Sequence, residues 1–152
     1  MSPKAAFYIL AEPSLKARDL YACRVIEKAY TNGHTIYVHT ATMDEAQNFD
    51  TQLWTFRDIS FVPHEIYSQN STSGAPILIG YNGIAPEKKE ILINLTSEIP
   101  SFYQQFDHII EIIPNDDQLK TAARKQYQVY QHSGYQMETF NIPIGLIANN
   151  KL

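Results

Sequence analysis

Residues 5–40 read AAFYIL AEPSLKARDL YACRVIEKAY TNGHTIYVHT, and the fold assignment depends on this pattern. The runs at 5–10 and 35–40 are rich in aromatic and β-branched residues, which favour strands. Between them, residues 14–31 carry apolar side chains at helical spacing, with Ser14 as a suitable N-cap and Asn32-Gly33 as a suitable stop. A strand, a helix and a strand within so short a stretch predict a βαβ unit with parallel strands.

The rest of the chain continues the alternation of strands and helices. Periodicity and capping predict helices over residues 43–56, 100–106 and 116–133. Apolar runs predict extended segments over residues 59–64, 76–81, 91–95 and 108–113. We expect residues 80–83 to form a hairpin turn between two of these runs. Together the elements predict an α/β sandwich of three layers around a mainly parallel, mixed sheet.

Length and composition favour one globular domain. The chain has 152 residues, of which 44% are hydrophobic and 18% are charged. We place the domain at residues 1–137 and expect the weakly periodic residues 138–152 to be a loosely held extension. The net charge of −4 argues against a dedicated duplex-binding protein. No apolar window is long enough to cross a bilayer and no signal segment is recognisable, so we expect a cytoplasmic protein.

Catalytic and metal-binding patterns are not recognisable in the sequence. The first strand–helix turn, residues 11–14, lacks the glycines of a phosphate-binding loop, and Glu12 would repel an anion there. Cys23 reads as a small buried hydrophobe, and Asp116-Asp117 as a helix cap. The five histidines have no metal-ligand spacing; His39, at the end of a strand, is the most suggestive and is better explained as structural. We therefore predict no catalytic residue, no metal and no cofactor.

The last helix carries the most suggestive surface. Its apolar arc, expected to face the sheet, comprises Leu119, Ala122, Ala123, Val129 and Tyr130. A neighbouring stripe comprises Lys120, Arg124, Gln128 and Gln131, with Tyr127 at the border. Residues 118–137 contain no acid. Composition leaves two interpretations open: a solvated helix face, or a groove for an acidic peptide or a terminal carboxylate.

A second candidate surface surrounds a helix end and a proline-stopped segment. It comprises Trp54, Phe56, Phe61 and Val62. Core packing beneath a loop would explain most of these residues, whereas an exposed aromatic among them could anchor a partner protein.

Several segments, in order, resemble the chi subunit of bacterial DNA polymerase III over about residues 5–137. The matching segments are 22–30 (ACRVIEKAY), Gly33, 38–40 (VHT), 53–54 (LW), 60–64 (SFVPH), 74–76 (GAP), 91–95 (ILINL), 112–114 (IIP), Leu119-Lys120, Ala123-Arg124, Tyr127 and Gly134-Tyr135. Each piece is short, but their order and spacing together are specific to that family.

The resemblance implies a Rossmann-like fold and a non-catalytic accessory subunit. Such a subunit pairs with the psi subunit of the clamp-loader assembly and grips the acidic C-terminal tail of single-stranded-DNA-binding protein, so DNA is reached only through partners. The tail-binding positions of the family match Lys120, Arg124 and Tyr127, with Ile113 in the apolar pocket. The psi-contacting aromatic matches Phe61, with Trp54 as its neighbour. The family also raises a helicase as a further partner of the psi-facing surface.

One departure from the family concerns Gln128, because family members often have a lysine there. Glutamine donates a hydrogen bond but brings no charge, so we expect tail binding to be weaker or shifted.

Two other hypotheses for the function remain. One is a small α/β nucleotide-binding or hydrolase domain with His39 at the carboxyl ends of the strands. The other is direct single-strand binding through the last helix, against which the net charge argues.

Overall fold

The computed structural model describes residues 3–55, 62–67, 74–81 and 89–144. In chain order its elements are β1 (Lys4–Leu10), α1 (Leu15–Thr31), β2 (Ile36–His39), α2 (Met43–Thr55), β3 (His64–Ile66), β4 (Ile77–Gly80), β5 (Ile91–Asn94), the short 3-10 helix η1 (Tyr103–Gln105), β6 (His108–Ile113), α3 (Asp117–His132) and β7 (Gln136–Ile142). The helices in these ranges all fall short of what crossing a membrane would require.

The strands form one seven-stranded sheet in the order β3-β4-β2-β5-β6-β1-β7, and every pairing is parallel. The expected mixed character of the sheet is therefore wrong, and so is the expected hairpin. Strands β4 and β5 do not pair with each other, because each pairs with β2 from opposite sides. All residues of β4 and β5 are buried, as is typical of parallel strands covered on both faces.

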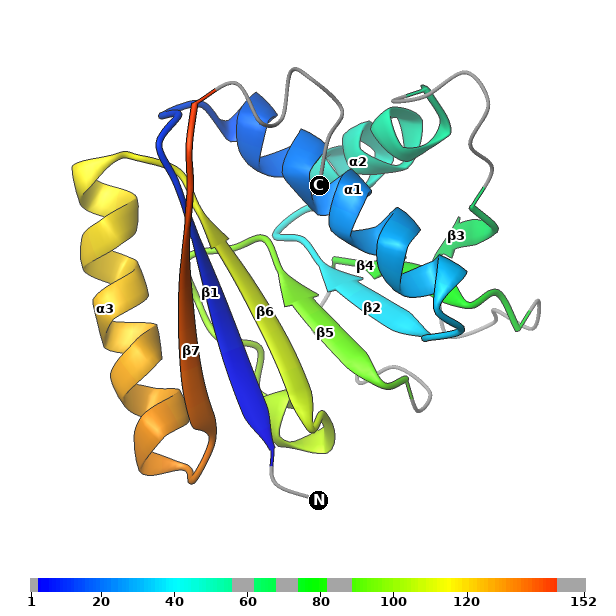
Figure 1. Cartoon of the computed structure of the whole chain (residues 1–152). Helices are drawn as coiled ribbons and strands as arrows, with labels where there is room; N and C mark the ends of the chain where they lie inside the picture. Colours follow the sequence, from blue (N-terminus) through cyan, green and yellow to red (C-terminus); the bar gives the residue numbers. More distant parts are fainter. Residues whose placement is uncertain (1–2, 56–61, 68–73, 82–88, 145–152) are drawn as a thin grey trace.

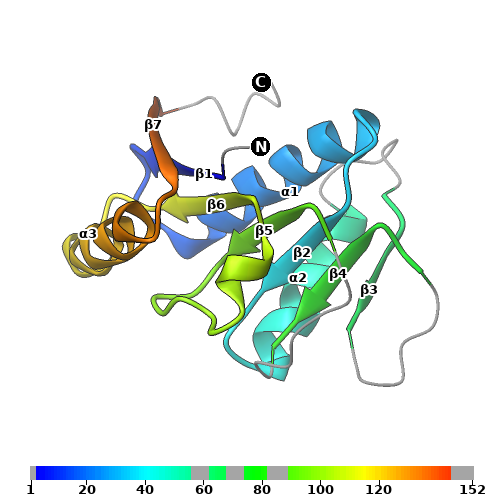
Figure 2. The same ribbon diagram turned by 90° about the horizontal axis from the view of Figure 1, so that it is seen from below.

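Helices cover the two faces of the sheet, which gives the expected three layers (Figures 1 and 2). Helices α1 and α2 pack on one face through a core cluster that includes Ile26, Phe49 and Ile79. Helix α3 and the segment around η1 pack on the other face through a cluster that includes Tyr130, Phe106 and Leu92. Side chains of successive strand residues point to opposite faces, so the central strands β2 and β4 contribute to both clusters.

The predicted helix caps are confirmed. The Ser14 side chain accepts a hydrogen bond from the backbone of α1, and Asn32-Gly33 ends that helix with Gly33 at φ 86°. At α2, Thr42 Oγ1 accepts from the Glu45 backbone at 3.1 Å. Asp116 accepts from the Leu119 backbone at 3.0 Å and caps α3.

Two predicted boundaries differ from the structure. The segment expected at 59–64 falls partly outside the described residues, and β3 begins only at His64, after Pro63, which has no N–H for a strand ladder. The loose extension expected after residue 137 is wrong up to Ile142, because β7 pairs in register with β1 from end to end. Its periodicity is weak because both faces of β7 are partly covered, so apolar residues occur at odd and even positions alike.

Candidate functional site

A groove of about 480 Å³ lies between α3 and the β7 side of the sheet. Its lining residues are Phe7, Ile9, Ile113, Lys120, Ala123, Arg124, Tyr127, Gln128, Gln131 and Thr139. All five residues that the sequence assigned to tail binding are among them, although Ile113 comes from a different element than the other four. The groove has an apolar floor from β1 and β6 and a polar wall from α3.

The turn of α3 explains why the polar stripe faces the groove. Ala123 and Tyr130 point into the core, and Lys120, Arg124 and Gln128 follow at four-residue spacing on the neighbouring flank. The predicted apolar arc is wrong at Val129, which is 42% exposed, while Gln126 is 5% exposed. Gln126 is buried because its amide reaches the backbone oxygen of Thr96 at 3.5 Å, an acceptor that the helical periodicity cannot reveal.

An aromatic and acidic cluster supports the groove from behind. The ring of Tyr127 packs against Phe7 at a centroid distance of 5.4 Å, and Phe7 also contacts Tyr130 at 6.0 Å. The Tyr130 hydroxyl donates to Glu111 Oε2 at 2.6 Å, and Asn94 Nδ2 donates to the same oxygen at 2.9 Å. Complete burial raises the pKa of Glu111 to about 8, so this carboxyl group is protonated at neutral pH.

The groove presents two cations that form no ion pair with an acid of the described residues. Arg124 is exposed, and Lys120 donates to the side-chain oxygen of Asn115. Neither cation belongs to an ion pair among the described parts of the chain. A guanidinium and an ammonium beside an apolar floor suit a ligand that combines carboxylates with a large apolar side chain.

The second predicted surface lies at the end of α2. Trp54 is 47% exposed, and its ring packs on His64 at a centroid distance of 4.6 Å. His64 Nε2 lies 3.1 Å from Asp50 Oδ1, and its Nδ1 lies 2.6 Å from the Val62 oxygen. Val62 itself is buried, as core packing requires. The sequence does not indicate that His64 and Asp50 belong to this surface, because no local pattern relates them to Trp54 before folding.

Two residues of this second surface, Phe56 and Phe61, lie outside the described residues. Trp54 locates this surface near one edge of the sheet, because its helix α2 contacts β3 and β3 is an edge strand. The groove lies beside β7, the other edge strand. Figure 2 shows β3 and β7 at opposite edges of the sheet. The two candidate surfaces are therefore at opposite edges of the molecule.

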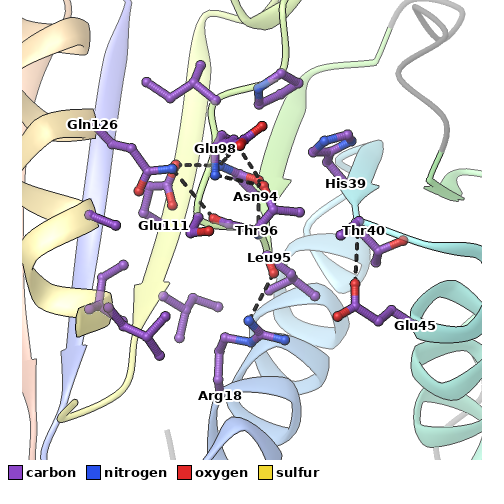
Figure 3. Close-up of a pocket in the computed structure, with 18 of the residues that line it drawn as sticks. Arg18, His39, Thr40, Glu45, Asn94, Leu95, Thr96, Glu98, Glu111 and Gln126 are labelled. Carbon is purple, nitrogen blue, oxygen red and sulfur yellow. Dashed lines mark hydrogen bonds between the residues drawn. The ribbon is translucent and has the colours of Figure 1, made fainter. Parts of the chain in front are cut away.

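A third concavity, of about 600 Å³, lies at the carboxyl ends of β2, β5 and β6 (Figure 3). It contains His39, the residue expected in the alternative nucleotide or hydrolase hypothesis. Burial lowers the pKa of His39, so the ring is neutral at pH 7, and its Nδ1 is buried with no hydrogen-bond partner among the residues that the structure describes. Arg18 lies in the same cleft, where it donates to the Leu95 oxygen at 2.9 Å and pairs with Asp19.

The chemistry of this cleft does not favour a phosphate. Glu45 and Glu98 line it, and Arg18, the one arginine among its described lining residues, is paired with Asp19. Cys23 lies elsewhere, fully buried in α1, where burial raises the pKa of its thiol. Within the described ranges, no group of three or more His, Cys, Asp or Glu side chains could hold a metal ion.

A comparison with protein families identifies a matching family. The model of the family described as "DNA polymerase III chi subunit, HolC" matches residues 2–138. Three curated relatives are DNA polymerase III subunit chi. The relative from Haemophilus influenzae is 32% identical over 143 residues, covering 93% of this chain and 99% of its own. The relative from Pseudomonas aeruginosa is 31% identical, covering 90% and 95%, and that from Escherichia coli is 26% identical, covering 89% and 95%.

Solved structures with a similar fold include helicase domains. T4 UvsW has a TM-score of 0.67 at 10% identity, covering 92% of this chain and 41% of UvsW. Domain 2 of the DEAD-box helicase Mss116p has a TM-score of 0.62 at 10% identity, covering 93% of this chain and 66% of that one. At such low identity the likeness shows a shared Rossmann-like α/β fold and nothing about function.

Proposed function

This chain belongs to the DNA polymerase III chi subunit family, and from that premise we propose that it is a non-catalytic adaptor in the replication complex. One face binds the acidic C-terminal tail of single-stranded-DNA-binding protein, and another binds the psi subunit of the clamp loader. The adaptor thereby links the clamp loader to coated template without contacting DNA itself.

The groove beside α3 is the observation that carries this proposal. Lys120, Arg124, Tyr127 and Gln128 line it together with Ile113, which the chain supplies from β6. Because Lys120 and Arg124 have no acidic partner among the described residues, an incoming acidic peptide does not have to displace one. A helix face that merely contacts solvent would also carry two cations, but it would not place them above an apolar floor.

The chemistry of the groove fits a tail that ends in phenylalanine with a free carboxylate. Arg124 offers paired N–H donors that match a carboxylate, while Lys120 supplies a second charge one helical turn away. The terminal ring fits between Tyr127 and Ile113, over the floor that Phe7 forms. Gln128 contributes a neutral hydrogen-bond donor where a lysine would add charge.

The psi subunit is assigned to the opposite edge, around Trp54. A half-exposed tryptophan over a histidine is the kind of side chain that dominates protein–protein interfaces. Separation of the two surfaces allows both partners to bind at the same time. A helicase that used the Trp54 face would instead compete with psi.

Fluorescence anisotropy of a labelled acidic peptide ending in Ile-Pro-Phe tests the groove. We expect micromolar affinity that weakens with salt, and a loss of at least about tenfold in Arg124→Ala. Lys125→Ala is the matched control, because Lys125 is also an exposed cation of α3 but lines a separate groove on the other flank. We expect this variant to bind like wild type.

Equal losses in Lys125→Ala and Arg124→Ala would contradict the proposal, since they would indicate non-specific charge attraction. Absence of binding at low salt would contradict it directly. Direct single-strand binding is the competing function, and a gel shift with labelled single-stranded DNA and no partner protein distinguishes it. We expect no shift.

A further inference from the structure

Strand β7 is an unusually open sheet edge. It is seven residues long, pairs with β1, and pairs with no other strand in the described ranges. Edge strands are commonly protected by lysine, proline or a bulge, because their free N–H and C=O groups can pair with another chain. Between residues 136 and 142 there is no lysine and no proline, and Glu138 is the single charge.

The register with β1 identifies the free backbone groups. In a parallel pair, the N–H and C=O of one residue point to the same side and alternate sides along the strand. The Gln136 N–H donates to the Pro3 oxygen at 2.8 Å, and the Ile142 oxygen accepts from Ala11 at 2.9 Å. Even-numbered residues of β7 therefore face β1. The outward residues are Met137, Thr139 and Asn141.

The side chains of these residues, whose backbone groups point away from β1, lie on the face of the sheet that α3 covers. Met137 packs with the core cluster beneath α3, and Thr139 lines the groove. Phe140, in contrast, stacks on Tyr8 on the opposite face at 5.2 Å. The unpaired backbone groups and the cationic groove are thus neighbours, and a chain entering the groove meets both.

We propose that the acidic peptide binds as an additional strand on the free edge of β7, with its alternate side chains directed into the groove. This inference rests on the proposed function of the groove. The backbone of Met137, Thr139 and Asn141 supplies three N–H donors and three C=O acceptors to the peptide. Extended peptide backbone then supplies affinity, and the α3 stripe supplies selectivity for acids.

The charge distribution sets the direction of the added strand. Helix α3 begins at Asp117, just after β6 ends at Ile113, so Lys120 and Arg124 lie near the carboxyl ends of the strands. A terminal carboxylate held there makes the peptide run parallel to β7. Its preceding residues pass Gln128 and Gln131, whose amides can donate to or accept from peptide side chains.

Backbone N-methylation of the peptide tests the strand without changing the protein. Each variant carries one methyl group on a backbone nitrogen upstream of Ile-Pro-Phe. We expect affinity to fall about tenfold at alternate positions and less than about twofold at the positions between them. A peptide that is bound only through its side chains and terminal carboxylate, without backbone pairing to β7, should show no such alternation.

Thr139→Pro tests the same pairing from the protein side. Proline removes the outward N–H of residue 139 and leaves the bonds to β1 intact, and edge strands tolerate proline in that orientation. We expect peptide binding about tenfold weaker than in Thr139→Val, a variant that changes the same side chain but keeps the backbone N–H. In wild type, saturating peptide should also slow amide hydrogen exchange at residues 137, 139 and 141 relative to 138 and 140.

The outcomes separate this inference from the proposed function. Binding that depends on Arg124 but is insensitive to N-methylation and to Thr139→Pro would overturn the added strand and leave the adaptor function standing. Absence of any peptide binding would overturn both. If Thr139→Pro does not fold, the N-methylation series decides alone. A peptide-free wild-type dimer that Thr139→Pro dissociates would overturn the inference in favour of β7 pairing between two copies.

Discussion

The hydroxyl of Tyr130 of α3 donates a hydrogen bond to Oε2 of Glu111 of β6 at 2.6 Å, and both residues are buried. Asn94 of β5 donates to the same oxygen. Tyr130 also packs on Phe7 of the groove floor, and Glu111 lines the third concavity. The wall of the groove is therefore fastened to the centre of the sheet through a carboxylic acid. Because the acid is neutral at pH 7, this connection does not require a buried counter-charge.

Glu111→Gln should remove a pH dependence of stability. The folded pKa of Glu111 is about 8, against 4.5 for an ordinary glutamate. Between these values the folded chain keeps a proton that the unfolded chain releases. The contribution of Glu111 to the free energy of unfolding is therefore complete below pH 4.5 and is lost as the pH rises through 8. In urea unfolding, we expect wild type to lose on the order of a few kcal/mol relative to Glu111→Gln between pH 5 and pH 9.

Comparing the pH dependence of stability in wild type and in Glu111→Gln separates the effect of Glu111 from that of the histidines. Burial lowers the pKa of His39 and His108, whose effect on stability has the opposite sign and is shared by wild type and variant. Parallel stability curves for the two proteins would contradict the assignment of a protonated Glu111.

Tyr130→Phe should destabilise the chain by about 1 to 2 kcal/mol, because it removes a hydrogen bond from a buried acid while keeping the ring. Tyr127→Phe is the matched control. Tyr127 is also a tyrosine of α3 packed on Phe7, and no hydrogen bond of its hydroxyl is found in the described structure. We expect this control to stay within about 0.5 kcal/mol of wild type by denaturant titration. Equal losses would mean that the Glu111 bond contributes nothing.

Gln128→Lys should tighten tail-peptide binding by a few fold at low salt, because it adds a third cation to the groove. The gain should disappear at high salt if its origin is electrostatic. Thr121→Lys adds the same charge on the other flank of α3, where it faces a different groove. Anisotropy titrations should show a larger gain for Gln128→Lys, and equal gains would contradict a localised site.

Trp54→Ala should weaken psi binding by at least about tenfold and leave tail-peptide binding unchanged. Met43→Ala is the matched control, since Met43 is a large apolar residue of the same helix with similar exposure, 48% against 47%. Arg124→Ala should show the reverse pattern in the same two assays. A loss of both partners in Trp54→Ala would contradict two separate surfaces.

Ending the chain after Tyr135 should lower the free energy of unfolding by several kcal/mol. The truncation removes β7, opens the edge of β1 and exposes Tyr8, on which Phe140 stacks. Thermal unfolding followed by circular dichroism measures the effect. A truncated chain as stable as wild type would restore the expectation of a dispensable extension.

Local signals in the sequence were sufficient for most helices and strands. The caps at Ser14, Thr42 and Asp116 are determined by residues within one turn of each helix, so the sequence predicts them correctly. The stripe of Lys120, Arg124 and Gln128 follows from helical spacing alone. The role of Ile113 came only from family resemblance, and the structure now places it on the floor of the groove.

The tertiary structure decided what depends on neighbours that are distant in sequence. Strand order, the insertion of β2 between β4 and β5, and the recruitment of β7 to the edge are set by long-range pairing that leaves little trace in local periodicity. Gln126 is buried and Val129 exposed because a carbonyl of the 94–98 segment lies under the helix. The sequence by itself determined the α/β class and the cationic stripe. Only the packing of α3 against β1, β6 and β7 made that stripe one wall of a groove. A groove requires two surfaces, and the second surface here includes Phe7 and Ile9, which lie more than a hundred positions from the stripe in the sequence.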